Sequence, residues 1–141
     1  MTDAAEGPLK DLVVIEMGTL IAGPFAGQIL GDFGARVIKI EDPRVGDPMR
    51  QWGRSLPQGL SPWWPVIGRN KQSVGLDLRT PEGRAIAGDL IAKADVLIEN
   101  FRPGTMEKWG MGYEALSAIN PRLIMARVSG FGQTGPYASR A

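Results

Sequence analysis

Residues 12–41 read LVVIEMGTLIAGPFAGQILGDFGARVIKIE, and this stretch decides the fold class. It opens with the β-branched apolar run LVVIEM at 12–17, which predicts a strand buried on both faces. It closes with RVIKIE at 36–41, where polar and apolar residues alternate as in a second strand. A helix between two strands within about 30 residues is typical of a right-handed parallel βαβ unit.

The helix of this unit is predicted from the helical spacing of large apolar residues, namely Phe25, Ile29, Leu30 and Phe33. Pro24 suits the first helical position, because its missing N–H costs nothing there. Gly34 is placed to end the helix in a left-handed conformation.

The same alternation continues along the chain. Thr80 predicts the start of a further helix, because Thr is a good cap and Pro81 suits the first turn. The other expected elements are strands at 73–78, 95–100 and 123–129 and a short helix at 113–119 that ends before Asn120-Pro121. This order predicts an α/β protein with a mostly parallel sheet, of a length that fits one domain.

An irregular segment, residues 42–69, interrupts the alternation. It is rich in Pro and Gly and contains three of the four Trp residues, Trp52, Trp63 and Trp64. A loop of this length inside a domain is usually functional or packed against another surface. We therefore interpret it as an ordered segment that covers a site or a partner.

The composition of the 141 residues excludes several kinds of site, because Cys and His are both absent. These residues hold no disulfide framework, no thiolate or imidazole metal site, no thiol nucleophile and no Ser-His-Asp triad. The net charge of +1 argues against a nucleic-acid surface. No stretch approaches the roughly 20 apolar residues that span a bilayer. The first ten residues carry Asp3 and Glu6 and no apolar run, unlike a signal peptide, so we expect a cytoplasmic location.

Charge is unevenly distributed along the chain. Residues 36–79 hold eight basic and four acidic residues, a net charge of +4, whereas the rest of the chain carries −3. A local excess of this kind suits a small polyanionic ligand. A solvated surface loop has the same composition, so both interpretations stay open on charge alone.

Three glycine-containing segments follow predicted strands. Residues 130–135 (GFGQTG) have the dinucleotide-binding spacing GxGxxG but follow the fifth strand, so a Gly-rich loop at the ligand-binding end of the sheet is the better interpretation. Residues 18–23 have the spacing of a phosphate-binding loop, but Pro24 and Phe25 stand where Lys and Ser or Thr are required. Residues 99–104 (ENFRPG) offer an amide, an aromatic face and a cation, or form a surface turn.

Taken together, five blocks in order resemble the N-terminal part of the family III CoA-transferases, the group that includes formyl-CoA and carnitine CoA-transferases. The blocks are VVIEMGTLIAGP, LGDFGARVIKIEDPRVGDPMR, NKQSVGLDLRTPEGR, ADVLIENFRPGTMEKWGMGYEAL and NPRLIMARVSGFGQTGPY, and the resemblance runs from Leu9 to Tyr137. It implies that residues 1–141 are the N-terminal portion of a Rossmann-like large domain. The family's small domain is lacking, so we expect this sequence to be a fragment.

The resemblance implies a reaction that moves coenzyme A between carboxylic acids. In that family an Asp carboxylate attacks the acyl-CoA thioester and gives a mixed anhydride and then an aspartyl-CoA thioester. A site that removes water from the carboxylate and donates hydrogen bonds to the developing oxyanions makes this route workable. The nucleophilic Asp is expected beyond Ala141, so no residue present is assigned as catalytic. The fragment alone is therefore expected to be inactive.

The resemblance also implies the ligands and the assembly. Acyl-CoA and a carboxylic acid are the expected substrates, with no covalently bound cofactor and no metal. Two ring-like subunits are expected to interlock as a homodimer. The Asp residues in this chain are expected to have ordinary roles as caps, turns or surface groups; they include Asp32, Asp42, Asp47, Asp77 and Asp95.

Part of a CoA-binding site is implied by residues that match the family's motifs. Ala22, in IAGP, lies where the backbone approaches the cofactor or its acyl end. Leu76 and Arg79, in GLDLR, match positions that line the adenosine side.

The fourth block implies four further contacts. Asn100 and Phe101, in IENF, match contacts to the pantetheine and nucleotide parts, and Arg102 is adjacent. Lys108, in MEKWG, stands where formyl-CoA transferases carry Arg. A Lys keeps the charge for phosphate but loses the bidentate geometry.

Three positions depart from the formyl-CoA transferases. Thr19 and Ile21 stand where those enzymes carry His and Gln near the thioester, and Asp42 stands where they carry Arg. A formyl or oxalyl substrate is therefore not expected, and Ile21 fits a larger or less polar acyl group.

Two other functions remain open from the sequence. The α-methylacyl-CoA racemases share these blocks but deprotonate the α-carbon with a His/Asp pair that also lies beyond the sequence given. A non-catalytic CoA- or nucleotide-binding module is the other alternative. In that case Trp52, Trp63 and Trp64 would leave an apolar patch exposed, and we expect the isolated chain to fold poorly.

Overall fold

The computed structural model describes residues 7–53 and 61–140 of the chain. The acidic residues Asp3 and Glu6 of the N-terminus and Arg54 of the basic segment lie outside the described residues.

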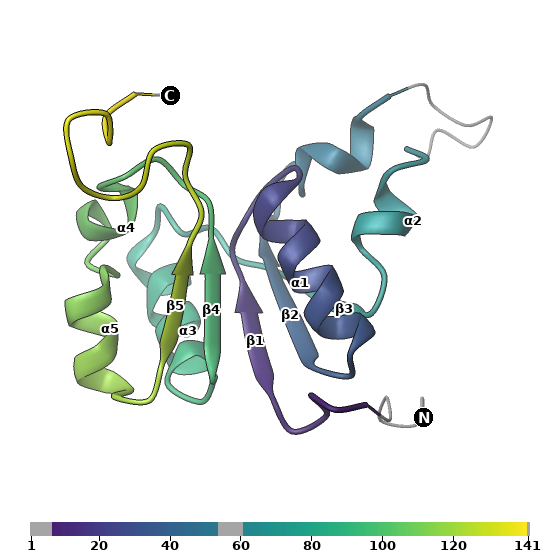
Figure 1. Ribbon diagram of the computed structural model, residues 1–141, viewed down its shortest axis with the longest axis horizontal. Coiled ribbons are helices and arrows are strands. Elements are labelled where there is room, and N and C mark those ends of the chain that lie inside the picture. Colours follow the sequence, from purple (N-terminus) through teal and green to yellow (C-terminus); the bar gives the residue numbers. More distant parts are fainter. Residues whose placement is uncertain (1–6, 54–60, 141) are drawn as a thin grey trace.

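Five strands form one sheet in the order β3-β2-β1-β4-β5 (Figure 1). All four neighbouring pairs are parallel. The strands are β1 (Val13–Glu16), β2 (Arg36–Glu41), β3 (Lys71–Gly75), β4 (Val96–Glu99) and β5 (Ile124–Arg127). The α/β class and the parallel sheet expected from the sequence are confirmed.

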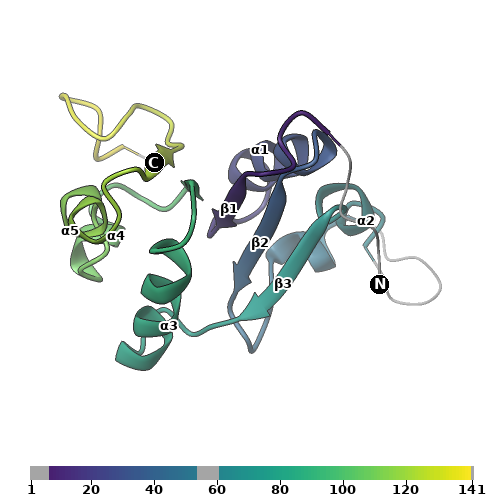
Figure 2. The same ribbon diagram turned by 90° about the horizontal axis from the view of Figure 1, so that it is seen from below.

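Helices cover both faces of the sheet (Figure 2). On one face, α1 (Ala22–Asp32) packs over a small core cluster that includes Val14, Val37 and Ile98. The opposite face carries the larger cluster, which includes Ile15, Ile40 and Leu97 together with side chains of three helices. Those helices are α3 (Pro81–Ile91), α4 (Thr105–Lys108) and α5 (Tyr113–Ile119). Neighbouring residues such as Val14 and Ile15 enter different cores because strand side chains alternate between faces.

The helix α1 differs from the expectation in its start, and its large apolar residues do not form the buried face. It begins at Ala22, so that Pro24 is its third residue rather than its first. Phe25, Ile29 and Phe33 are 38–52% exposed, whereas the buried positions are Gly23, Pro24, Gly27, Gln28 and Gly31. The reason lies beneath the helix, where a side chain on Gly27 would collide with the carboxylate of Glu16. Small residues let the helix approach this buried polar layer.

The local helix signals are confirmed. Gly34 follows α1 with φ +99°, the left-handed conformation that Gly adopts readily. The Thr80 hydroxyl accepts a hydrogen bond from Gly83 N at 3.0 Å and caps α3. The helix α5 ends at Ile119, before Asn120.

The segment 42–69 is more regular than expected, because its described part contains a short 3-10 helix η1 (Pro48–Gln51) and the one-turn helix α2 (Trp64–Ile67). The strand expected at 73–78 lies at 71–75, and α4 was not expected. One-turn helices are too short to give a periodic pattern, and β3 is a largely exposed edge strand. The strands expected at 95–100 and 123–129 are shorter, at 96–99 and 124–127.

The Trp residues of this segment make contacts between η1 and α2. The rings of Trp52 and Trp63 have centroids 5.9 Å apart, and both side chains are about half exposed. The Arg50 guanidinium carbon lies 3.7 Å from the centroid of Trp64. No helix in the described part of the chain has the length and apolar character needed to cross a bilayer.

Candidate functional site

A pocket of about 210 Å³ opens at the carboxyl ends of β1, β2, β3 and β4. This is the edge of a parallel α/β sheet where ligands bind. The strand order reverses direction between β1 and β4, so the pocket lies at the topological switch point. Many of the lining residues lie in the segments that follow the four strands, including Met17, Asp42, Leu76 and Phe101.

Three of the residues implicated by resemblance line this pocket, namely Leu76, Arg79 and Phe101. Two others are not among the lining residues. Asn100 follows β4 and is bonded to the lining residue Thr19, and Ala22 is the exposed first residue of α1.

The remaining two implicated residues are not brought to this pocket. Arg102 is exposed in the turn before α4, and Lys108 is exposed at the end of that helix. Neither is among the residues that line the pocket. Their expected contacts to CoA remain predictions.

One wall of the pocket is aromatic. Phe101 and Trp109 meet edge to face, with ring centroids 5.2 Å apart and an interplanar angle of 74°. Leu76 and Leu78 also line the pocket. Trp109 was missed from the sequence, although it stands directly after Lys108 in the MEKWG motif. The combination of flat apolar walls suits a ring-shaped ligand group.

Arg79 is already paired with two carboxylates. Its Nε lies 2.7 Å from Asp77 Oδ1, and its Nη2 lies 2.8 Å from Asp42 Oδ2. Hydrogen bonds from the Arg44 backbone and side chain keep the pKa of Asp42 below its usual value, so this carboxylate stays ionised. An incoming phosphate therefore competes with two carboxylates for Arg79.

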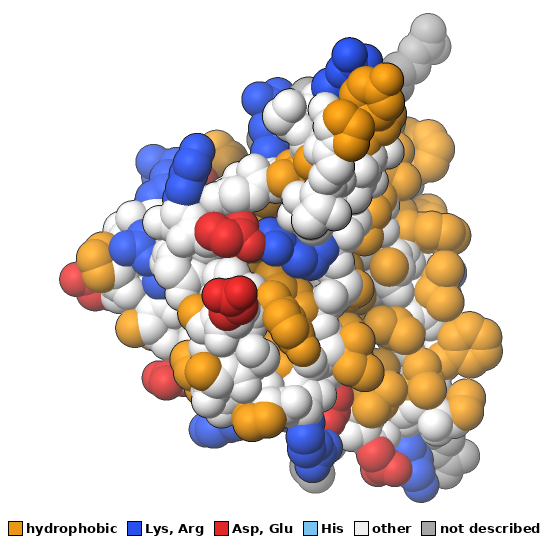
Figure 3. Space-filling view, turned by 60° about the vertical axis from the view of Figure 1, so that its left-hand side comes forward, with side chains coloured by type: hydrophobic (Ala, Val, Ile, Leu, Met, Phe, Trp, Pro, Cys, Tyr) orange, Lys and Arg blue, Asp and Glu red, His pale blue; other side chains and the backbone are white. Residues whose placement is uncertain are grey.

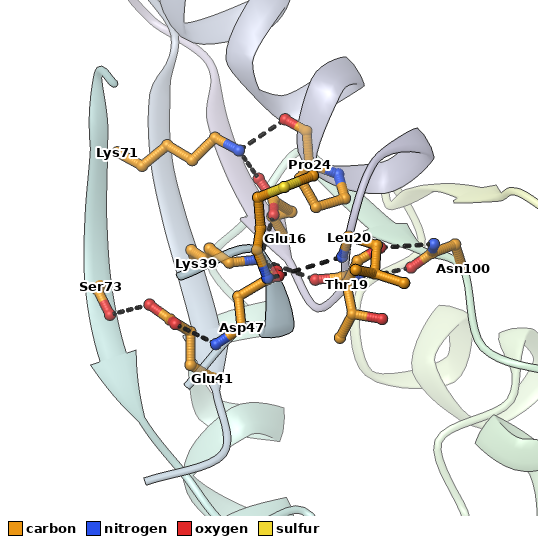
Figure 4. Close-up of polar contacts among 12 residues, drawn as sticks. Glu16, Thr19, Leu20, Pro24, Lys39, Glu41, Asp47, Lys71, Ser73 and Asn100 are labelled. Carbon is orange, nitrogen blue, oxygen red and sulfur yellow. Dashed lines mark hydrogen bonds and ion pairs between the residues drawn. The ribbon is translucent and has the colours of Figure 1, made fainter. Parts of the chain in front are cut away.

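Glu16, Lys39, Asp47 and Lys71 form a buried ionic cluster (Figure 4). Two of its members, Lys39 and Asp47, also line the pocket. Lys39 Nζ lies 2.7 Å from Glu16 Oε1 and 2.8 Å from Asp47 Oδ2, and Lys71 Nζ lies 2.6 Å from Glu16 Oε2. The four side chains are at most 2% exposed. Burial lowers the pKa of Lys71, and the neighbouring Glu16 carboxylate partly opposes this shift. The charges of the cluster compensate one another, as buried charges must.

This cluster holds the backbone of the loop between β1 and α1 and of the first turn of α1. Lys39 Nζ donates to the carbonyl oxygen of Gly18 at 2.8 Å, and Lys71 Nζ donates to that of Pro24 at 2.6 Å. The cluster was not expected from the sequence. Its signal in the sequence was a charge at a position predicted to be buried, since Glu16 lies within the apolar run at 12–17.

Glu41 is the last residue of β2 and also lines the pocket. It accepts hydrogen bonds from Arg50 Nε at 2.8 Å, Ser73 Oγ at 2.6 Å and Asp47 N at 2.7 Å. Burial raises the pKa of Glu41, but these hydrogen bonds outweigh it and lower the pKa to about 2. A carboxylate with so low a pKa is a weak proton acceptor, so Glu41 acts here as a fixed anion.

The other sequence motifs do not add a second site. Residues 130–135 form bends, with positive φ at Gly132 and Gly135, and a turn but no regular helix follows them in the described chain. The arrangement agrees with a Gly-rich loop and not with a dinucleotide fingerprint. Within the described ranges, no group of three His, Cys, Asp or Glu could hold a metal ion.

Comparison with known proteins gives the same family that the sequence blocks resemble. The family model described as CoA-transferase family III matches residues 9–141. Succinyl-CoA–D-citramalate CoA-transferase of Chloroflexus aurantiacus is 60% identical over 134 residues, which is 95% of this chain and 33% of the relative. The beta subunit of succinyl-CoA–L-malate CoA-transferase of the same organism is 53% identical over 133 residues, with 94% and 33% covered. The chain spans about a third of the length of these curated relatives.

A solved structure gives the corresponding match in three dimensions. The crystal structure of a CAIB/BAIF family protein from Brucella suis superposes with a TM-score of 0.89 at 46% sequence identity. The match covers 97% of this chain and 37% of that chain. Both the sequence match and the structural match thus extend over nearly all residues that form the sheet and its pocket, and the chain belongs to CoA-transferase family III.

Proposed function

We propose that the protein containing this chain transfers coenzyme A between carboxylic acids, and that the pocket described above binds one part of the CoA molecule. One observation carries the proposal. Leu76 and Arg79 follow β3 and Phe101 follows β4, yet all three line the same pocket at the carboxyl edge of the sheet. These are residues that the family resemblance associates with CoA.

The size of the pocket supports a partial site. Its volume of about 210 Å³ is below the roughly 300–1,000 Å³ of complete small-molecule sites. We assign it to the adenine end of CoA, with the ring between Leu76 and the Phe101–Trp109 wall. Arg79 at the same pocket would then meet a phosphate group, for which a guanidinium is well suited. The rest of CoA would extend toward the loop before α1, where Ala22 lies.

For the carboxylic acids, we propose dicarboxylates of four to five carbons. The support is that two relatives, at 60% and 53% identity, are named for succinyl-CoA with citramalate or malate. This agrees with the departures at Thr19 and Ile21, which do not favour a formyl or oxalyl group. Preference for oxalate would contradict this part of the proposal.

The chemical route that we propose uses an Asp from the part of the protein beyond this chain. Its carboxylate attacks the acyl-CoA carbonyl carbon and expels CoA thiolate, which leaves a mixed anhydride. The thiolate then attacks the aspartyl carbonyl and releases the first acid, so that CoA is held as an aspartyl thioester. The second acid reverses these two steps and leaves with CoA, and the Asp carboxylate is regenerated.

The test uses the product of the complete gene. The protein is incubated with succinyl-CoA and citramalate, malate, glutarate or oxalate, and acyl-CoA products are separated by chromatography. We expect new dicarboxylyl-CoA and little oxalyl-CoA. Intact-mass measurement with succinyl-CoA alone should find a CoA adduct on the protein. Exchange of the α-hydrogen of a 2-methylacyl-CoA in D₂O, without CoA transfer, would instead identify a racemase, and binding without turnover would identify a binding module.

We also propose that the protein forms the interlocked homodimer expected from the family. The support is an apolar surface on α1, defined by Ile21, Phe25, Ile29 and Phe33, which are four residues apart and 38–52% exposed. Hydrophobic side chains are gathered along the right-hand side of the view in Figure 3. Light scattering of the complete protein tests the assembly, and a monomer would contradict it. The expected cytoplasmic location belongs to the same proposal and is tested by cell fractionation.

A further inference from the structure

The loop between β1 and α1 contains a residue in an unfavourable backbone conformation. Leu20 has φ +63°, in the left-handed region that Leu rarely adopts. Such a conformation persists only where surrounding interactions impose it, and it clusters at functional sites. The preceding residue, Thr19, lines the pocket, so the conformation of this loop sets the shape of the pocket wall.

On one side, the loop is held by Asn100 (Figure 4). Asn100 Oδ1 accepts a hydrogen bond from Thr19 N at 2.7 Å, and Asn100 Nδ2 donates one to the Thr19 carbonyl oxygen at 2.9 Å. Both polar groups of the side chain thus bind the backbone of one residue, 81 positions away in the sequence. This pairing fixes the peptide groups on either side of Thr19.

On the other side, the loop is held by Asp47. Its Oδ1 accepts hydrogen bonds from Leu20 N at 3.2 Å and from Met49 N at 2.8 Å. Its Oδ2 lies 2.8 Å from Lys39 Nζ, which also binds the carbonyl oxygen of Gly18. Asp47 is 1% exposed, so this side of the loop is anchored in the buried ionic cluster.

We propose that Asn100 is a positioning residue, which acts on the acyl-CoA ligand through the backbone of Thr19 and Leu20. The inference rests on the proposed function, and it refines the role of Asn100, for which the family resemblance implies a direct contact with CoA. Asn100 holds Leu20 in its left-handed conformation against Asp47, and this keeps the pocket wall in the form that the ligand requires. Without the side chain of Asn100, Leu20 relaxes toward an ordinary conformation and the wall is lost.

The first experiment separates positioning from general stability. Asn100→Ala is compared with Asn120→Ala in the complete protein. Asn120 is a matched control because its Nδ2 also makes two bonds to backbone, to Ile91 O at 3.1 Å and Ala94 O at 2.7 Å, at the end of α3. We expect similar shifts of the melting temperature for the two variants. Only Asn100→Ala should raise KM for acyl-CoA. We expect a rise of about tenfold, which corresponds to the free-energy cost of the left-handed backbone conformation of Leu20.

A milder variant keeps this test informative if Asn100→Ala folds poorly. Asn100→Asp has nearly the same shape and keeps the acceptor for Thr19 N, but it places an oxygen against the Thr19 carbonyl. It should raise KM as Asn100→Ala does. An equal KM increase in Asn120→Ala, or an unchanged KM in Asn100→Asp, would overturn the proposal.

The second experiment separates positioning from direct contact with the ligand. Gly adopts positive φ without the steric cost that Leu pays. In a Leu20→Gly background, therefore, Asn100→Ala should raise KM at least threefold less than it does in the wild-type background. An equal effect in both backgrounds means that Asn100 does not act through Leu20, and it would overturn the inference.

Failure of this inference can be distinguished from failure of the proposed function. CoA binding is measured by calorimetry in parallel with turnover. If the wild-type protein neither binds CoA nor transfers it, the proposed function fails and the inference fails with it. If the wild type binds CoA and Asn100→Ala binds it equally well, the inference alone fails.

Discussion

Arg79 makes two ion pairs at the pocket, with Asp77 and with Asp42, and its side chain is about half exposed. If it binds a phosphate of CoA, Arg79→Ala removes a charge-assisted hydrogen bond worth about 1.5–3 kcal/mol. We expect KM for acyl-CoA to rise by at least about tenfold, with a small change in kcat, in steady-state kinetics of the complete protein.

Arg122→Ala is the matched control for this substitution. Arg122 is also an exposed Arg in an ion pair, 3.2 Å from Asp95, but it lies beside the N-terminal ends of β4 and β5. Its replacement should leave KM unchanged. A similar rise in KM for both variants would mean that Arg79 contributes only to the overall charge of the protein.

Glu41 gives a prediction of pH dependence. Its pKa in the folded protein is about 2, below the ordinary value of 4.5, so ionised Glu41 stabilises the fold. This contribution is fully present above about pH 4.5 and is lost as the pH falls toward 2. Glu41→Gln should therefore lower the free energy of unfolding by about 2–3 kcal/mol at pH 7.

Thermal unfolding of wild type and Glu41→Gln at a series of pH values checks this prediction. The difference in melting temperature should shrink between pH 4.5 and pH 2. If the difference in melting temperature stays constant over this range, the hydrogen bonds from Arg50 and Ser73 do not stabilise the ionised form of Glu41.

Single residues were predictable where their roles are local. The cap at Thr80 and the left-handed Gly34 depend on their immediate neighbours, and both were expected from the sequence. The buried ionic cluster was not, because Lys39 meets Glu16 across 23 residues. Periodicity indicates that a residue points inward, but it does not say which charge it will meet there.

At the scale of elements, α1 shows that helical spacing predicts where a helix lies but not which of its side chains are buried. The spacing of Phe25, Ile29 and Phe33 predicted a helix at the right place, but it did not predict that these three side chains would be exposed. Amphipathic patterns assume an apolar sheet beneath the helix. Here the sheet presents Glu16, and only glycines leave room for it.

The glycines of α1 lead to a prediction about packing. Gly27→Ala would place a methyl group against the Glu16 carboxylate, which is held by two Lys side chains and cannot yield. We expect a loss of about 1–3 kcal/mol in stability, measured as a lower melting temperature of the complete protein.

Gly88→Ala in α3 is the contrasting variant. A Cβ at Gly88 meets nothing within 4 Å in the described structure. Ala should therefore stabilise the helix by about 0.5–1 kcal/mol, since it loses less backbone entropy than Gly. A stabilising effect of both substitutions would show that α1 can move away from Glu16 at no cost.

At the scale of the whole molecule, large apolar side chains are exposed on more than one element. The α1 surface is one example, and Ile124 of the edge strand β5 is 64% exposed. We expect the isolated 141-residue chain to associate with itself, to bind a hydrophobic dye and to melt over a broad range. Light scattering and thermal unfolding test this, and a monomer with a sharp cooperative transition would contradict it.

The family and the topology of the molecule were predictable from the sequence, whereas the contacts of its exposed side chains were not. Five sequence blocks gave the family, and the order of strands and helices gave the parallel sheet. Leu76, Arg79 and Phe101 line one pocket, whereas Arg102 and Lys108 do not, and the contacts of all five with CoA stay predictions. Both Arg102 and Lys108 have exposed side chains, and the sequence pattern does not indicate what contacts an exposed side chain makes.

Because β1 lies at the centre of the sheet, its two neighbouring strands are synthesised at different times. β1 is the first strand to leave the ribosome, but its partner β4 follows much later, with Val13 bonded to Asp95 across 82 residues. At an elongation rate of about 5–20 residues per second, β1 waits for β4 for about 4–16 s. During this interval β2 is the only strand partner of β1 that has been made, and the other edge of β1 is open. The nascent chain is therefore most exposed to chaperones, and most vulnerable to misfolding, before residue 96 is made.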